Sequence, residues 1–171
     1  MLKKRFGGLL AALMLFGCSG NPLPVNLEAG DALPQFSVRM NNGTRVRTAD
    51  LLGQPSVIVF FSVDCIDCRH LLPQIQKLWD MDLGLPIVLI ARKNTAADIV
   101  PFWAFSEFTM TYSPQRSRRI YSRFAPSRIP RIYISDDQGI IRYIHADEHL
   151  PSARELADEI ESLTQNYTSH D

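Results

Sequence analysis

The sequence predicts an α/β sandwich, in which helices flank a central mixed β-sheet. From about Gly30, runs of β-branched and aromatic residues alternate with segments whose apolar residues recur at helical spacing. The chain then closes with two strand-like runs joined by a short turn, followed by a last helix. With 171 residues, 46% of them hydrophobic, the chain has room for one such domain and a targeting segment.

The first half of the domain is expected to centre on one buried strand. Residues 36–40 predict a short strand, an N-terminal extension that turns at residues 41–43, and residues 48–52 predict one helical turn. Residues 56–62 form a continuous β-branched and aromatic run, which is typical of a strand buried on both faces. Residues 68–79 predict a helix, and Pro73 should kink it.

The second half repeats the alternation. Residues 86–91 predict another buried strand, residues 95–105 a helix, residues 109–112 a weak strand and residues 117–124 a short helix. Residues 131–135 and 140–145 predict two strands joined by a hairpin turn. Residues 151–167 predict the last helix, with Leu156, Ile160 and Leu163 on its apolar face.

The N-terminus has the pattern of an export signal. Lys3, Lys4 and Arg5 precede an apolar run of twelve residues, 6–17, which is too short to span a bilayer as a helix. The run ends in Leu15-Phe16-Gly17-Cys18, which resembles the bacterial lipobox. We therefore expect a signal peptide at 1–17, a lipid on Cys18, a flexible tether at 18–29 and the folded domain at 30–171. The alternative is an ordinary signal peptide with a coincidental cysteine.

The charge balance excludes one class of partner. The formal net charge is zero, and it becomes −3 without the three basic residues at the start of the chain. A nucleic-acid-binding domain needs a strongly basic face, so no nucleic acid is expected as a partner.

The chemistry is expected at Cys65-Ile66-Asp67-Cys68, between the buried strand and the following helix. Free N–H groups at a helix N-terminus favour a thiolate, so Cys65 is the expected nucleophile and Cys68 the resolving thiol. This redox-active disulfide would be the only cofactor. A zinc site needs four ligands, no second C-x-x-C exists, and His145, His149 and His170 are scattered, so no metal is expected.

Four neighbours are expected to modulate the pair. Asp64 and Asp67 place negative charge beside Cys65, which disfavours its thiolate and makes the disulfide relatively stable. The protein should then be a reductant rather than a strong oxidant. Arg69 offers a compensating charge. His70 is a candidate for proton transfer to Cys68 or, alternatively, a residue of the helix surface.

Several motifs lie in register with one family. They are Gly30-Asp31-Ala32-Leu33-Pro34-Gln35-Phe36, Asp50-Leu51-Leu52-Gly53, the two cysteines followed by Arg69 and Pro73, and Ile129-Pro130. On these residues the stretch 30–139 resembles the TlpA/ResA-like thiol–disulfide oxidoreductases of bacterial envelopes. The resemblance implies a thioredoxin-like fold, a membrane anchor facing the periplasm, disulfide-containing envelope proteins as substrates and a membrane thiol electron donor.

The same resemblance gives Pro130 a role. It implies a cis bond before Pro130 that turns the Ile129 backbone toward Cys65, where it pairs with an extended substrate segment. Composition alone favours a trans proline at the start of a strand.

Three other functions remain open at this point. A thioredoxin-fold copper metallochaperone would bind Cu(I) through both cysteines and a distant histidine such as His145. A peroxiredoxin-like peroxidase requires a Pro-x-x-x-Thr-x-x-Cys pattern, which the residues around Cys65 do not supply. A non-catalytic binding module would keep the fold without cycling its cysteines.

Overall fold

The computed structural model describes residues 25–165, and its centre is a five-stranded sheet in the order β5-β4-β3-β6-β7. Strand β3 (Ser56–Phe61) lies in the middle, parallel to β4 (Ile87–Ala91) and antiparallel to β6 (Arg131–Ser135). The edge strands are β5 (Tyr112–Ser113) and β7 (Ile141–His145). Both pairing directions occur in one sheet, which confirms the predicted mixed topology.

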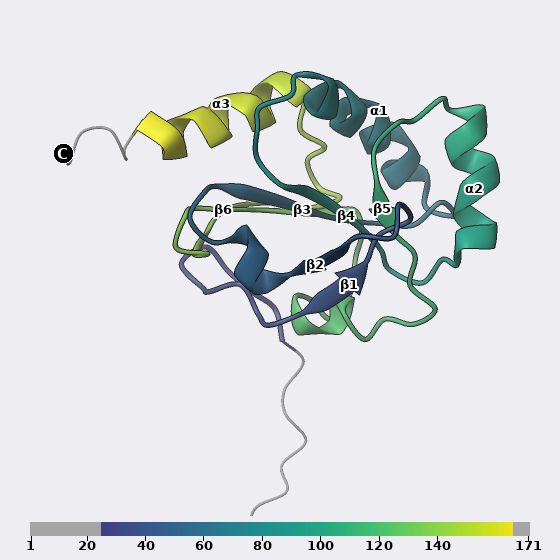
Figure 1. The fold of residues 1–171 in the computed structure, drawn as a ribbon, viewed down its shortest axis with the longest axis horizontal. Coiled ribbons are helices and arrows are strands. Elements are labelled where there is room, and N and C mark those ends of the chain that lie inside the picture. Colours follow the sequence, from purple (N-terminus) through teal and green to yellow (C-terminus); the bar gives the residue numbers. More distant parts are fainter. Residues whose placement is uncertain (1–24, 166–171) are drawn as a thin grey trace, which may run out of the picture.

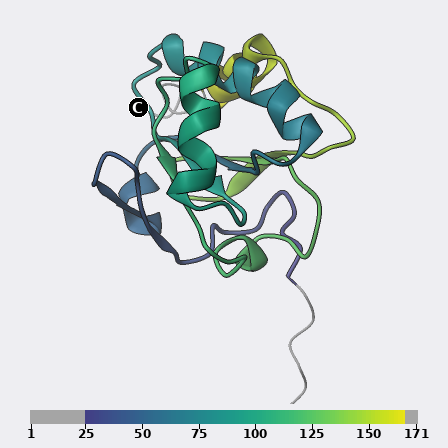
Figure 2. The same cartoon turned by 90° about the vertical axis from the view of Figure 1, so that its right-hand side faces the viewer.

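Helices and a small hairpin cover the two faces of this sheet. Helices α1 (Ile66–Asp80) and α3 (Ala153–Gln165) contact each other on one face, and α2 (Ala96–Phe105) lies toward the β5 edge (Figure 1). The opposite face carries a two-stranded hairpin and two short 3-10 helices, as the rotated view in Figure 2 also shows. These elements are β1 (Ser37–Arg39), β2 (Arg45–Arg47), η1 (Thr48–Leu51) and η2 (Tyr121–Arg123).

The buried strand β3 organises the core from both of its faces. All six of its residues are buried, as the continuous apolar run predicts. Successive side chains of a strand point to opposite faces, so Phe60 packs edge-on against Phe124, whereas Phe61 packs against Trp103 of α2. The strand is thereby fixed between two aromatic clusters, and its C-terminal end, where the cysteine motif begins, is held in place.

The structure differs from the sequence prediction at three places. Strand β2 was not expected, because its Arg-Val-Arg run offers a single apolar residue to the core. The weak strand predicted at 109–112 is instead the two-residue β5 at Tyr112–Ser113. The helix predicted at 117–124 is only the 3-10 turn η2. The segment lies between Pro114 and Pro126, and a single short turn is enough to bury Ile120, Tyr121 and Phe124.

Several predictions fall outside the residues that the structure describes. They are the signal peptide at 1–17, the lipidated Cys18, most of the tether and the expected end of the last helix near residue 167. Within residues 25–165, no helix is both long enough and apolar enough to cross a membrane.

Candidate active site

The two cysteines lie at the start of α1, where the chain leaves β3. Cys65 is the N-cap of the helix, with extended backbone, and its Sγ accepts a hydrogen bond from the N–H of Cys68 at 3.4 Å. Both cysteines are free thiols. Cys65 is half-buried, whereas Cys68, in the first turn, is fully buried. One sulfur therefore faces outward and the other lies behind it.

Burial sets the chemistry of the inner thiol. Loss of solvent raises the pKa of the Cys68 thiol, and its hydrogen bond with the Cys65 thiol and the charge of Cys65 act in the same direction. A backbone hydrogen bond from Ser62 and the charge of Arg92 oppose the shift. Cys68 consequently retains its proton at neutral pH while both cysteines are reduced.

The segment that contains Pro130 lies directly against Cys65. The Ile129–Pro130 peptide bond is cis, as the family resemblance implies. The Ile129 carbonyl accepts a hydrogen bond from the Cys65 thiol, with 3.5 Å between the two heavy atoms. The Tyr121 hydroxyl donates to the carbonyls of Ser127 and Arg128. This aromatic side chain of the core therefore holds the proline segment in position beside the dithiol.

Asn94 belongs to the site, although the sequence analysis did not identify it. Its buried side chain accepts from the N–H of Val63 at 3.2 Å and donates to the Asp64 carboxylate at 2.8 Å. Asp64 is thus bound to an amide rather than standing alone beside Cys65. A signal existed: Asn94 follows β4, and parallel neighbours such as β3 and β4 end at the same edge of a sheet.

The remaining expected neighbours surround the dithiol differently. Arg69 donates from Nε to the Val63 carbonyl at 2.6 Å, and its guanidinium lies 5.6 Å from the centre of the Phe102 ring. Asp67 is half-buried in the first turn of α1, and His70 is exposed on the same helix. The structure therefore brings Cys65, Cys68, Ile129, Pro130, Asp64 and Arg69 together with Asn94, and it places His70 on the surface.

Two of the histidines that seemed scattered come together in space. His145 ends β7, and His149 lies in the following loop, next to Glu155 of α3. This grouping cannot be read from the sequence, because it depends on how α3 packs against β7.

Paired thiols at the head of a helix, beside a cis-proline segment, on a five-stranded mixed sheet define a thiol–disulfide oxidoreductase of the thioredoxin-like class. Residues 29–144 match the model of the AhpC/TSA family, and the chain belongs to that family. This agrees with the resemblance to TlpA/ResA-like proteins.

Similar proteins cover most of the chain. The thioredoxin-like protein YneN of Bacillus subtilis (strain 168) is 26% identical over 156 residues, which are 85% of this chain and 91% of YneN. A solution structure from Bacteroides thetaiotaomicron has a TM-score of 0.72 at 20% identity, covering 84% of this chain and 95% of the other. A secreted disulfide oxidoreductase of Mycobacterium tuberculosis has a TM-score of 0.66 at 19% identity, covering 75% and 96%. The two structures establish the likeness of fold.

Proposed function

We propose that the protein reduces disulfides of exported proteins, with Cys65 as the nucleophile and Cys68 as the resolving thiol. The observation that carries this proposal is the unequal burial of two thiols at one helix N-terminus, where the backbone N–H of Cys68 donates a hydrogen bond to Sγ of Cys65. A half-exposed sulfur is accessible to a protein disulfide, and a buried sulfur one turn away can attack only its neighbour.

The reaction transfers two electrons from the dithiol to the substrate. The Cys65 thiolate attacks one substrate sulfur, the substrate disulfide breaks, and the released sulfur takes up a proton. Cys68 then loses its proton and attacks the Cys65 sulfur, which releases the second substrate thiol and leaves a Cys65–Cys68 disulfide. A membrane thiol electron donor returns the pair to the reduced state.

The neighbouring residues are assigned supporting roles. In the reduced protein the Ile129 carbonyl accepts a hydrogen bond from the Cys65 thiol. When Cys65 loses that proton and attacks, the carbonyl becomes available to an extended substrate segment beside Pro130. Asp64 and Asp67 add negative charge near Cys65, at the start of α1. Arg69 stabilises the Val63 backbone in front of the motif, and His70, which is exposed on α1, is assigned the alternative role of a helix-surface residue.

We further propose an envelope location, with a signal peptide at 1–17 and a lipid on Cys18 that anchors the domain through the tether, facing the periplasm. The N-terminal sequence pattern supports this, as does the secreted relative from Mycobacterium tuberculosis. Labelling with radioactive palmitate should mark the wild-type protein and not Cys18→Ala. Equal labelling of the two would exclude the anchor.

The copper alternative receives no support from the geometry. Among residues 25–165, the one group of three or more ligand residues close enough to hold a metal contains His145 but neither Cys65 nor Cys68. The distant histidine of that alternative is bonded instead to Glu159.

The proposal is tested by trapping the mixed disulfide. In Cys68→Ser, Cys65 can attack a substrate but nothing resolves the product, so covalent adducts with exported proteins should accumulate and dissolve in dithiothreitol. Cys65→Ser is the matched control and should give none. If the adduct pattern of Cys68→Ser is no stronger than that of Cys65→Ser, the chain does not act through Cys65.

A further inference from the structure

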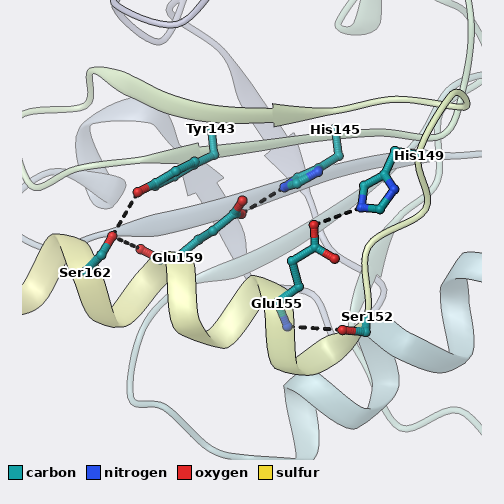
Figure 3. A network of polar contacts seen from close by, with 7 residues as sticks. All are labelled: Tyr143, His145, His149, Ser152, Glu155, Glu159 and Ser162. Carbon is teal, nitrogen blue, oxygen red and sulfur yellow. Dashed lines mark hydrogen bonds and ion pairs between the residues drawn. The ribbon is translucent and has the colours of Figure 1, made fainter.

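A cluster of histidine and glutamate side chains lies between β7 and α3, and it shares no residue with the dithiol site. Nε2 of His145 lies 2.8 Å from Oε2 of Glu159, and Nε2 of His149 lies 2.8 Å from Oε1 of Glu155 (Figure 3). The ring centroids of the two histidines are 6.0 Å apart. One ligand atom from each of His145, His149 and Glu155 lies within 4.8 Å of the other two.

We propose that His145, His149 and Glu155 form a binding site for a divalent transition-metal ion, with Zn²⁺ as the best match. Two imidazoles and one carboxylate are a donor set that zinc accepts, with bonds of about 2.0–2.2 Å. In tetrahedral geometry such ligand atoms stand about 3.4 Å apart. The three ligand atoms lie within 4.8 Å of one another, so side-chain rotation alone can bring them to the separation that the ion requires.

The flexible members of the cluster are those that must move. The side chains of His149 and Glu155 are 64% and 39% exposed, so both can rotate without disturbing the core. His145 is the fixed member, because it ends β7 and its side chain is only 10% exposed. A site with one rigid and two mobile ligands assembles around the ion and leaves a fourth position open to water.

Glu159 supplies the partner that orients the fixed ligand. Metal-binding histidines usually direct their second ring nitrogen at a carboxylate, which fixes the ring and its tautomer. Glu159, one turn along α3 from Glu155, is hydrogen-bonded to Nε2 of His145 in this way. Nδ1 of His145 is therefore the nitrogen that can bind the ion. Glu159 is therefore a positioning residue in this site.

The loop that carries His149 is itself held in place. Arg128 forms ion pairs with Asp147 and Glu148, the two residues before His149. Leu150 and Pro151 then lead into α3, and Pro151 is buried. Because both ends of the short connection are held, less backbone freedom is lost when the ion binds.

The test is calorimetric titration of the full chain with ZnCl₂, in a Cys65→Ser/Cys68→Ser background so that thiolates contribute nothing. One equivalent of Zn²⁺ should bind. His149→Ala and Glu155→Gln should each weaken binding by tenfold or more, and Glu159→Gln by about tenfold. His70→Ala removes an exposed histidine elsewhere and should leave the titration unchanged.

Two further measurements make the outcome decisive. Co²⁺ in place of Zn²⁺ should give the visible absorption of a tetrahedral complex, and Zn²⁺ should raise the thermal unfolding temperature of the parent but not of His149→Ala. The proposal is wrong if Zn²⁺ does not bind stoichiometrically, or if binding survives both His149→Ala and Glu155→Gln. The cluster would then be two ion pairs and no metal site. Neither result bears on the disulfide exchange, because the titrated protein lacks both thiols.

Discussion

At the residue scale, Asn94 shows how one buried amide organises a reactive loop. It bonds the backbone of Val63 and the carboxylate of Asp64, the two residues before the nucleophilic cysteine. The sequence predicts Cys65, Cys68 and Pro130 because their chemistry and spacing are local or shared with a family. It does not predict Asn94, which lies 31 residues from Val63 and reaches it only when β3 and β4 pair.

Replacing Asn94 should therefore destabilise the protein as well as the loop. In Asn94→Ala the buried N–H of Val63 loses its acceptor, which costs about 1–3 kcal/mol. Urea unfolding with a fluorescence readout measures this loss. Lys93→Ala, at the exposed neighbouring position, is the control and should change stability by less than about 0.5 kcal/mol. Equal stability of the two variants would show that water replaces the amide and that Asn94 is not structural.

At the element scale, the sequence predicts best where one periodicity continues over many residues. Strand β3 and helix α1 are found close to their expected bounds, and helix α3 begins close to its expected start, because their apolar spacing extends over whole strands or turns. Elements of two or three residues, such as β2, β5 and η2, carry too few side chains to show a period. Their conformation is set by the neighbours against which they pack.

The turn between β6 and β7 provides a test at this scale. Gly139 has a φ of +76°, and a Cβ added there would lie 2.7 Å from Cδ2 of Leu52, which follows η1. Gly139→Ala should lower the free energy of unfolding by about 1–2 kcal/mol for the backbone conformation, with a smaller further cost because the exposed Leu52 side chain must rotate away. Urea denaturation measures both contributions.

A matched substitution separates the two costs. Gly84 has a φ of +70° and nothing within 4 Å of an added Cβ, so Gly84→Ala carries the backbone cost alone. Gly139→Ala should be the more destabilising variant, and adding Leu52→Ala should reduce the difference. If Gly139→Ala and Gly84→Ala are equally stable, the contact with Leu52 has no energetic weight.

At the scale of the whole molecule, the packing of α3 connects two groups of residues that the sequence keeps apart. Helix α3 contacts α1, which carries the dithiol, and it also presents Glu155 and Glu159 to the histidines of β7 and its loop. Arg128, which pairs with that loop, immediately precedes Ile129, the residue in contact with Cys65. This proximity could not be predicted from sequence, because it depends on three elements whose relative placement no local pattern encodes.

The burial of Cys68 should also make the stability of the whole reduced protein depend on alkaline pH. Burial raises the pKa of the Cys68 thiol, whereas a cysteine of the unfolded chain titrates near 8.5. Above that pH the unfolded chain releases a proton that the folded protein keeps, so the unfolded state gains stability. The free energy of unfolding is then independent of this group below about pH 8 and falls by about 1.4 kcal/mol per pH unit above about 8.5.

Urea midpoints between pH 7 and 9.5, in the presence of a phosphine reductant, measure this slope. Cys68→Ser is the control, because a hydroxyl does not titrate in that range and its curve should lack the contribution of the buried thiol. The upper limit matters, since burial also raises the pKa of Tyr112, Tyr121 and Tyr133, which would add a decline of the same sign above about pH 10. Parallel curves for the reduced wild type and Cys68→Ser would mean that solvent reaches Cys68, and the division of the dithiol into an outer and an inner sulfur would then be wrong.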